Sequence, residues 1–182
     1  MSNQLAVLFP GIGYHIDKPL LYYSAKLARA RGYDLRAVQY PALPTGLRGH
    51  AEKIEQAVQT ALSAAEEQFT AIDWTAYDRV FFLSKSIGTA IAARYAVQHN
   101  IHPRQVYYTP IEQALPYLDP TGIAFHGTAD PWAETNSIRK LAAQKDVPLF
   151  LTQNANHSLE TGDVLTDIFI LKTTMERVQR FI

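Results

Sequence analysis

The sequence contains no cysteine among its 182 residues. A chain without cysteine cannot form disulfides, use a thiolate as a nucleophile or bind a metal ion through thiolate sulfur. Disulfides are rare in reducing compartments, so a cysteine-free composition is typical of a cytoplasmic protein. We therefore expect a cytoplasmic protein whose chemistry depends on oxygen and nitrogen groups.

An excess of charge is also lacking, because 17 Lys and Arg residues balance 17 Asp and Glu residues. No run of like charge favours nucleic acid or an anionic membrane as a partner. No apolar run approaches the roughly 18 residues that a membrane-spanning helix needs. The N-terminal stretch MSNQLAVLFPGIGYH has no basic segment ahead of its short apolar run, so it predicts a first strand and not a signal peptide.

Hydrophobic residues are plentiful by contrast. They make up 47% of the chain, and aromatic residues make up 11%, which is typical of a folded globular protein. No repeat, low-complexity tract or linker divides the sequence. We expect residues 1–182 to form one domain that is long enough to bury a sizeable core.

Six short apolar runs, rich in Val, Phe, Tyr and Leu, alternate with helical patterns. They are too short, and too closely bounded by turn residues, to be helices. Helical periodicity is clearest over residues 51–69 and recurs over 165–178, while residues 90–96 are apolar on nearly every side. Strands of this kind predict a doubly wound α/β fold, with a mostly parallel six-stranded sheet and helices on both faces. The predicted strands are residues 4–9, 35–40, 79–83, 105–109, 122–127 and 148–153.

Polar and small residues gather where four of these strands end. In a sheet of this type the ligand site lies outside the carboxyl ends of the strands. A serine, an aspartate and a histidine, Ser86, Asp130 and His157, would therefore share one edge of the sheet, in that order along the chain. The four post-strand segments are residues 10–15, 84–88, 126–131 and 154–160.

Each of these three residues also has a purely structural interpretation. Ser86 stands where a small hydroxyl side chain could cap the following helix. Asp130 precedes Pro131, which is typical of a helix N-cap. His157 by itself would be an ordinary surface histidine. Their order, and their common place at strand ends, favour a shared catalytic role.

With these motifs the sequence resembles the α/β-hydrolase superfamily, and specifically its small single-domain serine hydrolases without a cap. The resemblance runs from about Gln4 to the C-terminus. The nucleophile elbow of that superfamily is usually G-x-S-x-G, and this chain matches it with Ser86 and Gly88 but has Ser84 at the first position. The oxyanion loop commonly reads His-Gly-x-Gly, and residues 10–13 keep both glycines but begin with Pro10.

The resemblance implies a carboxylesterase-like enzyme that cleaves a small ester or a related acyl bond through an acyl-enzyme. It implies Ser86 as the nucleophile, His157 as the base that takes its proton, and Asp130 as the acid that orients the imidazole. Such an enzyme needs no cofactor and no metal ion, and its partner is a small-molecule substrate.

Further site residues are expected around the nucleophile. The backbone N–H groups of Ile12 and Ile87 are the expected oxyanion donors. Gly11, Tyr14 and His15 are expected to lie near the substrate. The interval 111–121 is short and broken by proline, so it predicts no separate lid and an open site.

Two alternatives remain open at this point. A binding protein of the same fold that has lost catalysis would account for the altered elbow and the altered oxyanion loop. A metal-assisted hydrolase would use His126, Asp130, His157 and His15 as ligands. No closely spaced metal-binding motif supports that second alternative, which would leave the serine elbow without a role. Nothing in the sequence indicates an oligomeric state.

Overall fold

The computed structural model describes residues 3–182, so the first two residues of the predicted domain lie outside the described residues. Its sheet has six strands, all parallel, in the order β2-β1-β3-β4-β5-β6. The strands are β1 Gln4–Phe9, β2 Asp34–Ala37, β3 Arg79–Lys85, β4 Arg104–Tyr108, β5 Ile123–Gly127 and β6 Leu149–Thr152. The helices are α1 Pro19–Ala30, α2 Ala51–Phe69, α3 Ile87–Gln98, α4 Thr135–Gln144 and α5 Val164–Phe181, with short 3₁₀ helices η1 Trp74–Ala76 and η2 Glu112–Tyr117.

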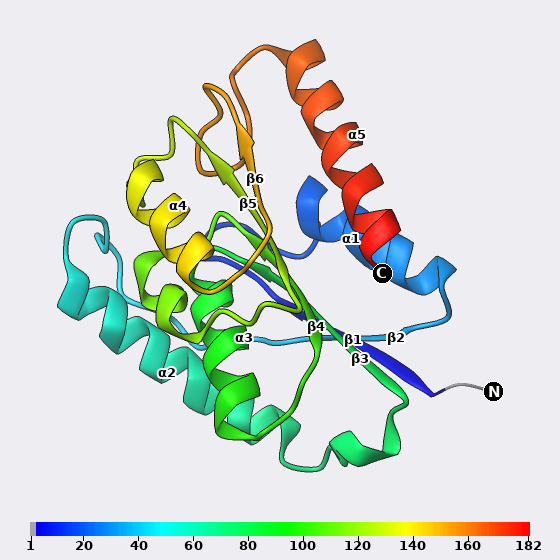
Figure 1. The fold of residues 1–182 in the computed structure, drawn as a ribbon. Coiled ribbons are helices and arrows are strands. Elements are labelled where there is room, and N and C mark those ends of the chain that lie inside the picture. The colour runs from blue at the N-terminus through cyan, green and yellow to red at the C-terminus, as the bar shows by residue number, and fades with distance from the viewer. Residues whose placement is uncertain (1–2) are drawn as a thin grey trace.

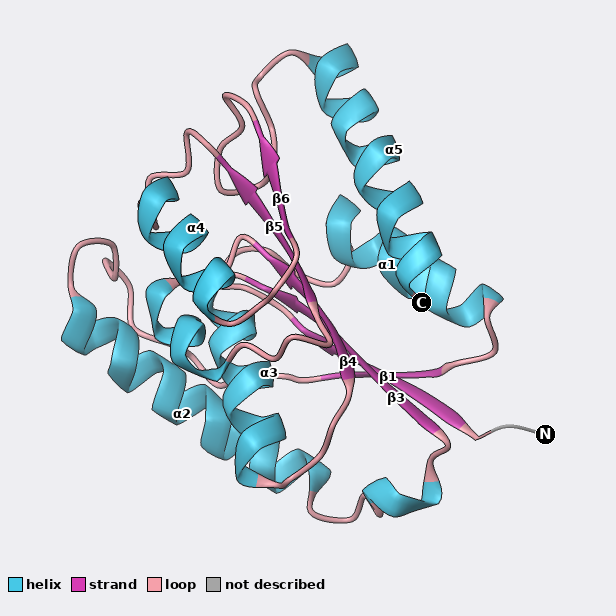
Figure 2. Ribbon diagram, in the orientation of Figure 1, coloured by secondary structure: helices cyan, strands magenta, loops and turns pink. Residues whose placement is uncertain are grey.

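The helices cover the sheet on both sides, which confirms the predicted fold class (Figure 1). Figure 2 shows α1 and α5 on one face of the sheet and α2, α3 and α4 on the other. Successive side chains of a strand point to opposite faces, so Val7 and Phe9 of β1 pack toward α2 and α3 while Ala6 and Leu8 pack toward α1 and α5. The near-continuous apolar character of the strands follows from this burial on both faces.

All six predicted strands are present, but β2 ends at Ala37, three residues earlier than the sequence predicts. The reason is a side chain from α2. Gln68 accepts a hydrogen bond from the Gln39 N–H at 2.9 Å and donates one to its carbonyl oxygen at 2.6 Å. Because the backbone of Gln39 is paired with a side chain, the chain leaves the sheet and starts a long loop toward α2.

The N-terminus of α3 lies unusually close to the end of β1. A Cβ atom at Gly88 would stand 2.6 Å from the carbonyl oxygen of Pro10 and would overlap that of Phe9. Only glycine permits this approach. The contact brings the residue before α3, Ser86, to the start of the 10–15 loop.

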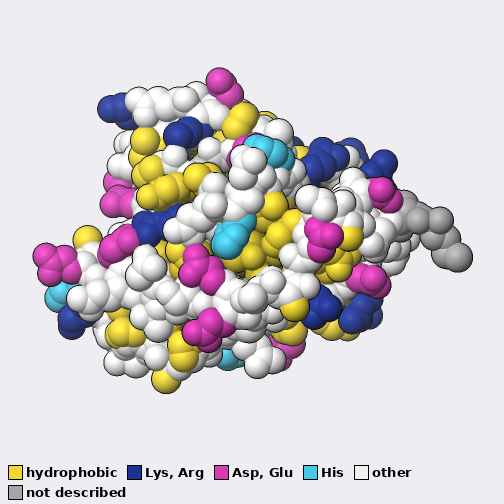
Figure 3. Space-filling model, turned by 90° about the horizontal axis from the view of Figure 1, so that it is seen from below, with side chains coloured by type: hydrophobic (Ala, Val, Ile, Leu, Met, Phe, Trp, Pro, Cys, Tyr) yellow, Lys and Arg dark blue, Asp and Glu magenta, His cyan; other side chains and the backbone are white. Residues whose placement is uncertain are grey.

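None of the helices within residues 3–182 is both long enough and apolar enough to cross a membrane. Acidic and basic side chains are interspersed on the face shown in Figure 3, around a central apolar stretch. This distribution agrees with the equal numbers of acidic and basic residues in the sequence.

The turn from β3 into α3 places Ser86 in a conformation that side chains disfavour, with φ at 56° and ψ at −123°. Strain of this kind typically amounts to about 1–3 kcal/mol. It is maintained by the surrounding backbone, because the Ser86 N–H donates to the Tyr108 carbonyl at 3.0 Å and the Ser86 carbonyl accepts from the Thr89 N–H at 2.9 Å.

Glycine usually makes a protein less stable than alanine does at the same position. The strain at Ser86 predicts the opposite order at this position. Ser86→Gly should be more stable than Ser86→Ala by about 1 kcal/mol, because glycine adopts this conformation without a Cβ clash. Both variants lack the hydroxyl group, so its loss cancels in the comparison. The measurement is the free energy of unfolding in urea.

Ser84, in the interior of β3, provides the matched control. There, Ser84→Gly should be less stable than Ser84→Ala by roughly 0.5–1 kcal/mol, as is usual for glycine in a strand. If alanine were also the better residue at position 86, the turn would not be strained in solution.

Candidate active site

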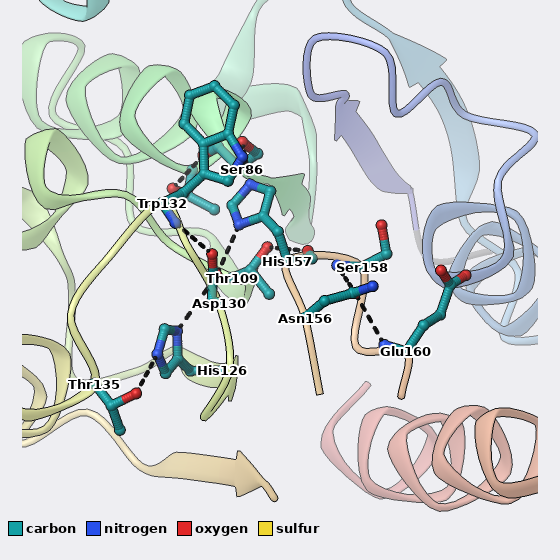
Figure 4. Close-up of polar contacts among 11 residues, drawn as sticks. Ser86, Thr109, His126, Asp130, Trp132, Thr135, Asn156, His157, Ser158 and Glu160 are labelled. Carbon is teal, nitrogen blue, oxygen red and sulfur yellow. Dashed lines mark hydrogen bonds and ion pairs between the residues drawn. The ribbon is translucent and has the colours of Figure 1, made fainter. Parts of the chain in front are cut away.

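The side chain of Ser86 is directed at a histidine. His157 Nε2 lies 2.7 Å from Ser86 Oγ, and His157 Nδ1 lies 2.7 Å from Asp130 Oδ2 (Figure 4). With the ring proton on Nδ1, His157 donates to Asp130 and its Nε2 accepts from the serine hydroxyl. Ser86 makes no capping hydrogen bond to α3 in the described structure, so its hydroxyl is not used as a helix cap.

Asp130 is fixed in place by its own loop. Its Oδ1 accepts a hydrogen bond from the Trp132 N–H at 2.8 Å, while its Oδ2 accepts from His157. The carboxylate is fully buried, whereas 17% of the His157 side chain remains exposed. The aspartate is therefore shielded from water and the imidazole is open toward the solvent side.

His157 stands in a loop that folds back on itself between β6 and α5. Asn156 accepts hydrogen bonds from the Ser158 N–H at 2.7 Å and the Glu160 N–H at 3.2 Å. Thr109, just after β4, donates its hydroxyl to the His157 carbonyl at 3.0 Å. A Cβ atom at Gly127 would lie 2.6 Å from the carbonyl of Asn156, so glycine at the end of β5 lets this loop approach the sheet. These contacts set the position of the imidazole from both sides.

The electrostatic environment favours a neutral His157. Burial lowers the pKa of His157 below its usual value of 6.5. The hydrogen-bonded carboxylate of Asp130 acts in the opposite direction, and the positive charge of Lys85 lowers the pKa further. A neutral imidazole is the form that can accept a proton from serine.

His126 does not lie where the metal-assisted hydrolase would need it as a metal ligand. Its ring is fully buried behind Asp130, with Nδ1 3.7 Å from Asp130 Oδ2 and Nε2 3.1 Å from the Thr135 hydroxyl (Figure 4). Burial lowers its pKa. Among residues 3–182, no three His, Asp or Glu side chains are grouped so that they could hold a metal ion.

The 10–15 loop forms a tight turn against the elbow. Gly11 and Tyr14 exchange backbone hydrogen bonds of 3.1 and 3.3 Å, and Gly13 adopts a positive φ of 71°. A Cβ atom at Gly11 would lie 3.1 Å from Ser86 Cβ. The turn therefore carries Ile12 close to Ser86. The Ile87 N–H, at the start of α3, has no helical partner of its own.

A cavity of about 300 Å³ opens beside Ser86. Its walls are mostly apolar and come from the 10–15 loop, the loop after β2, the start of α2 and the loop after β5. Trp132 closes one side and stacks on His157 with ring centroids 5.5 Å apart. The lining residues are Ile12, Pro44, Thr45, Gly46, Leu47, Ile54, Ser86, Ile87, Ile111, Trp132 and His157.

The structure brings together six of the residues singled out from the sequence, Gly11 against Ser86 among them, and separates two others. Ile12 and Ile87 line the cavity with Ser86 and His157, and Asp130 lies behind them. Tyr14 instead accepts a hydrogen bond from the Leu20 N–H at 3.1 Å and lines a cavity next to α5. His15 lines a cleft by the end of β2.

The sequence analysis missed the other residues of the cavity wall, which come from residues 44–47, Ile54, Ile111 and Trp132. The segment 44–47 gives no catalytic signal, and its position depends on the early end of β2. Trp132 carried a usable signal, because it is a large aromatic residue two positions after a strand-end aspartate, and in the structure its ring stacks on His157.

Comparison with known proteins identifies the fold. No model of a protein family matches the sequence, and no curated protein matches it either. Among solved structures, Est1E from Butyrivibrio proteoclasticus with ferulic acid bound has a TM-score of 0.69 at 10% identity, covering 99% of this chain and 88% of that one.

Two further structures show the same likeness. An α/β serine hydrolase without a lid from Xanthomonas campestris has a TM-score of 0.62 at 12% identity, covering 100% of this chain and 84% of that one. An α/β serine hydrolase homologue from Coxiella burnetii has a TM-score of 0.61 at 14% identity, covering 99% and 85%. With its six parallel strands and its matching helical layers, this chain has the α/β-hydrolase fold.

Proposed function

We propose that the protein is a serine hydrolase that cleaves a small carboxylic ester or a related acyl bond. The observation that carries the proposal is the continuous hydrogen-bonded path from Ser86 through His157 to Asp130, with both steps at 2.7 Å. The serine lies on a strained turn and faces an apolar cavity, as a nucleophile should. The structural likeness to serine hydrolases supports the same reaction class.

In the proposed reaction, His157 Nε2 takes the proton of Ser86 as its oxygen attacks the acyl carbon. Asp130 remains ionised and stabilises the imidazolium through Nδ1–H. The N–H groups of Ile12 and Ile87 are the candidate donors to the oxyanion, which needs them already in place. The imidazolium then protonates the leaving alcohol, and water hydrolyses the acyl-enzyme with His157 again as the base. No cofactor is required.

A covalent probe tests the nucleophile. A fluorophosphonate should label the wild-type protein, and Ser86→Ala should abolish labelling while the protein stays folded. Ser84→Ala is the control, because the Ser84 hydroxyl is fully buried and donates to the Val106 carbonyl at 2.8 Å. Labelling that is lost in Ser84→Ala and kept in Ser86→Ala would reverse the assignment. A folded wild-type protein that reacts with no such probe would favour the non-catalytic alternative.

The pH dependence of kcat/KM tests the base. Activity should fall as the pH drops through the pKa of His157, which burial holds below 6.5, so the protein should remain active in mildly acidic solution. His157→Ala should lose roughly 10³-fold or more in kcat. His126→Ala should lose much less, because His126 lies behind Asp130 and not beside the serine. If His126→Ala were the inactive variant, His126 would be the base.

The cavity beside Ser86 limits the size of the acyl group. Filling its apolar walls should contribute at most about 0.8 kcal/mol for each methylene group removed from water. We therefore expect kcat/KM for p-nitrophenyl esters to rise modestly with acyl length, and to level off once the cavity of about 300 Å³ is filled. A continued steep rise toward long chains, or a jump in rate on emulsified triglyceride, would contradict a small ester as the substrate.

A further inference from the structure

A lysine is buried directly beside the candidate nucleophile. Lys85 is the last residue of β3, precedes Ser86 in the chain and is only 1% exposed. Charged side chains are almost never fully buried unless they are paired. Yet Lys85 forms no salt bridge within residues 3–182, because no carboxylate oxygen there lies within 4.0 Å of its Nζ.

The surroundings of Lys85 are aromatic. Its Nζ lies 4.9 Å from the centroid of the Tyr14 ring, in a cation–π arrangement. Tyr108 stands opposite Lys85 on β4, and its hydroxyl is hydrogen-bonded to Ser24 at 2.7 Å. The carboxylates that act on Lys85 are Asp130 and Glu160, from the loops after β5 and β6. Asp130 already accepts hydrogen bonds from His157 and Trp132.

Packing alone does not explain a lysine here. A leucine or methionine could occupy this position without the desolvation cost that a buried ammonium group carries. Burial lowers the pKa of Lys85 to about 7, while the carboxylates of Asp130 and Glu160 oppose this change. A fraction of the molecules therefore carries a protonated Lys85 near neutral pH. The positive charge then interacts with the other titratable groups of the site.

Lys85 directly precedes Ser86, whose Oγ lies 2.7 Å from His157 Nε2, so the charge of Lys85 stands one residue away from the partner of the imidazole. Four titratable or charged groups act on that imidazole or bond to it: Asp130, Lys85, His126 and the hydroxyl of Ser86. Asp130 favours the protonated ring, while Lys85 and His126 disfavour it. His126 is itself buried and its pKa is lowered, so Lys85 supplies the cation.

We propose that Lys85 is a positioning residue whose buried ammonium group keeps His157 unprotonated, so that the base stays available at lower pH than Asp130 alone would allow. The role as a base rests on the proposed function, but the effect of the charge on His157 can be measured without any activity. Lys85 does not line the cavity beside Ser86, so its effect on the reaction is assigned to its charge and not to a contact with the substrate.

The test is a proton NMR titration of the His157 ring in the wild type and in Lys85→Met, with the resonance assigned by its loss in His157→Gln. Methionine is unbranched like the lysine stem but one atom shorter, and it removes the ammonium group with its charge. The titration midpoint of His157 should rise by at least ~0.5 pH unit in Lys85→Met. The acidic limb of kcat/KM should move by the same amount. Lys85→Gln serves as the second uncharged variant if Lys85→Met does not fold.

Lys26→Met is the matched control. Lys26 also lies over a tyrosine ring, with Nζ 5.0 Å from the centroid of Tyr22, but it is exposed on α1. Its loss should leave the His157 midpoint unchanged. An unchanged midpoint in a folded Lys85 variant would overturn the proposal. A raised midpoint in a protein with no hydrolase activity would support the role of Lys85 and reject the proposed function, so the two failures are distinguishable.

Discussion

The carboxyl edge of the sheet depends on two places where backbone touches backbone without an intervening side chain. At Gly88 the start of α3 lies against the end of β1, and at Gly127 the end of β5 lies against the loop that carries His157. Both contacts require a residue without a Cβ atom. The first brings Ser86 to the 10–15 loop, and the second brings His157 over Asp130. The 2.7 Å hydrogen bonds of the site follow from these two approaches.

Much of this arrangement could be predicted from the sequence because it depends on patterns that are local. Short apolar runs between helical stretches fix the six parallel strands, and parallel strands place their carboxyl ends at one edge. The residues Ser86, Asp130 and His157 could be found from their places at strand ends together with the resemblance to the α/β-hydrolase superfamily. The distances between these side chains could not be predicted, because the altered elbow gives no information on how closely the loops approach one another.

The features that sequence analysis missed are tertiary. The end of β2 depends on Gln68, a residue 29 positions away from Gln39. The burial of Lys85 depends on Tyr14 and on the helices α1 and α5 that cover this face of the sheet. In the sequence, nothing about Lys85 indicates that its side chain is buried. Because helices cover both faces of the sheet, residues 81–85 of β3 are all buried, Lys85 among them.

The open side of the site follows from the connection between β4 and β5. Residues 109–122 contain η2 and no longer helix, so nothing in this interval extends over the cavity as a separate lid. The walls come instead from the loop after β2, through Pro44 to Leu47, and from Trp132. A loop that leaves the sheet early is therefore what encloses the space beside Ser86. Because Trp132 is 36% exposed and 17% of the His157 side chain is exposed, the enclosure is partial, and water can reach the imidazole from the same side as a substrate. Such access suits the second half of the proposed reaction, in which water must enter while the acyl group still occupies the cavity.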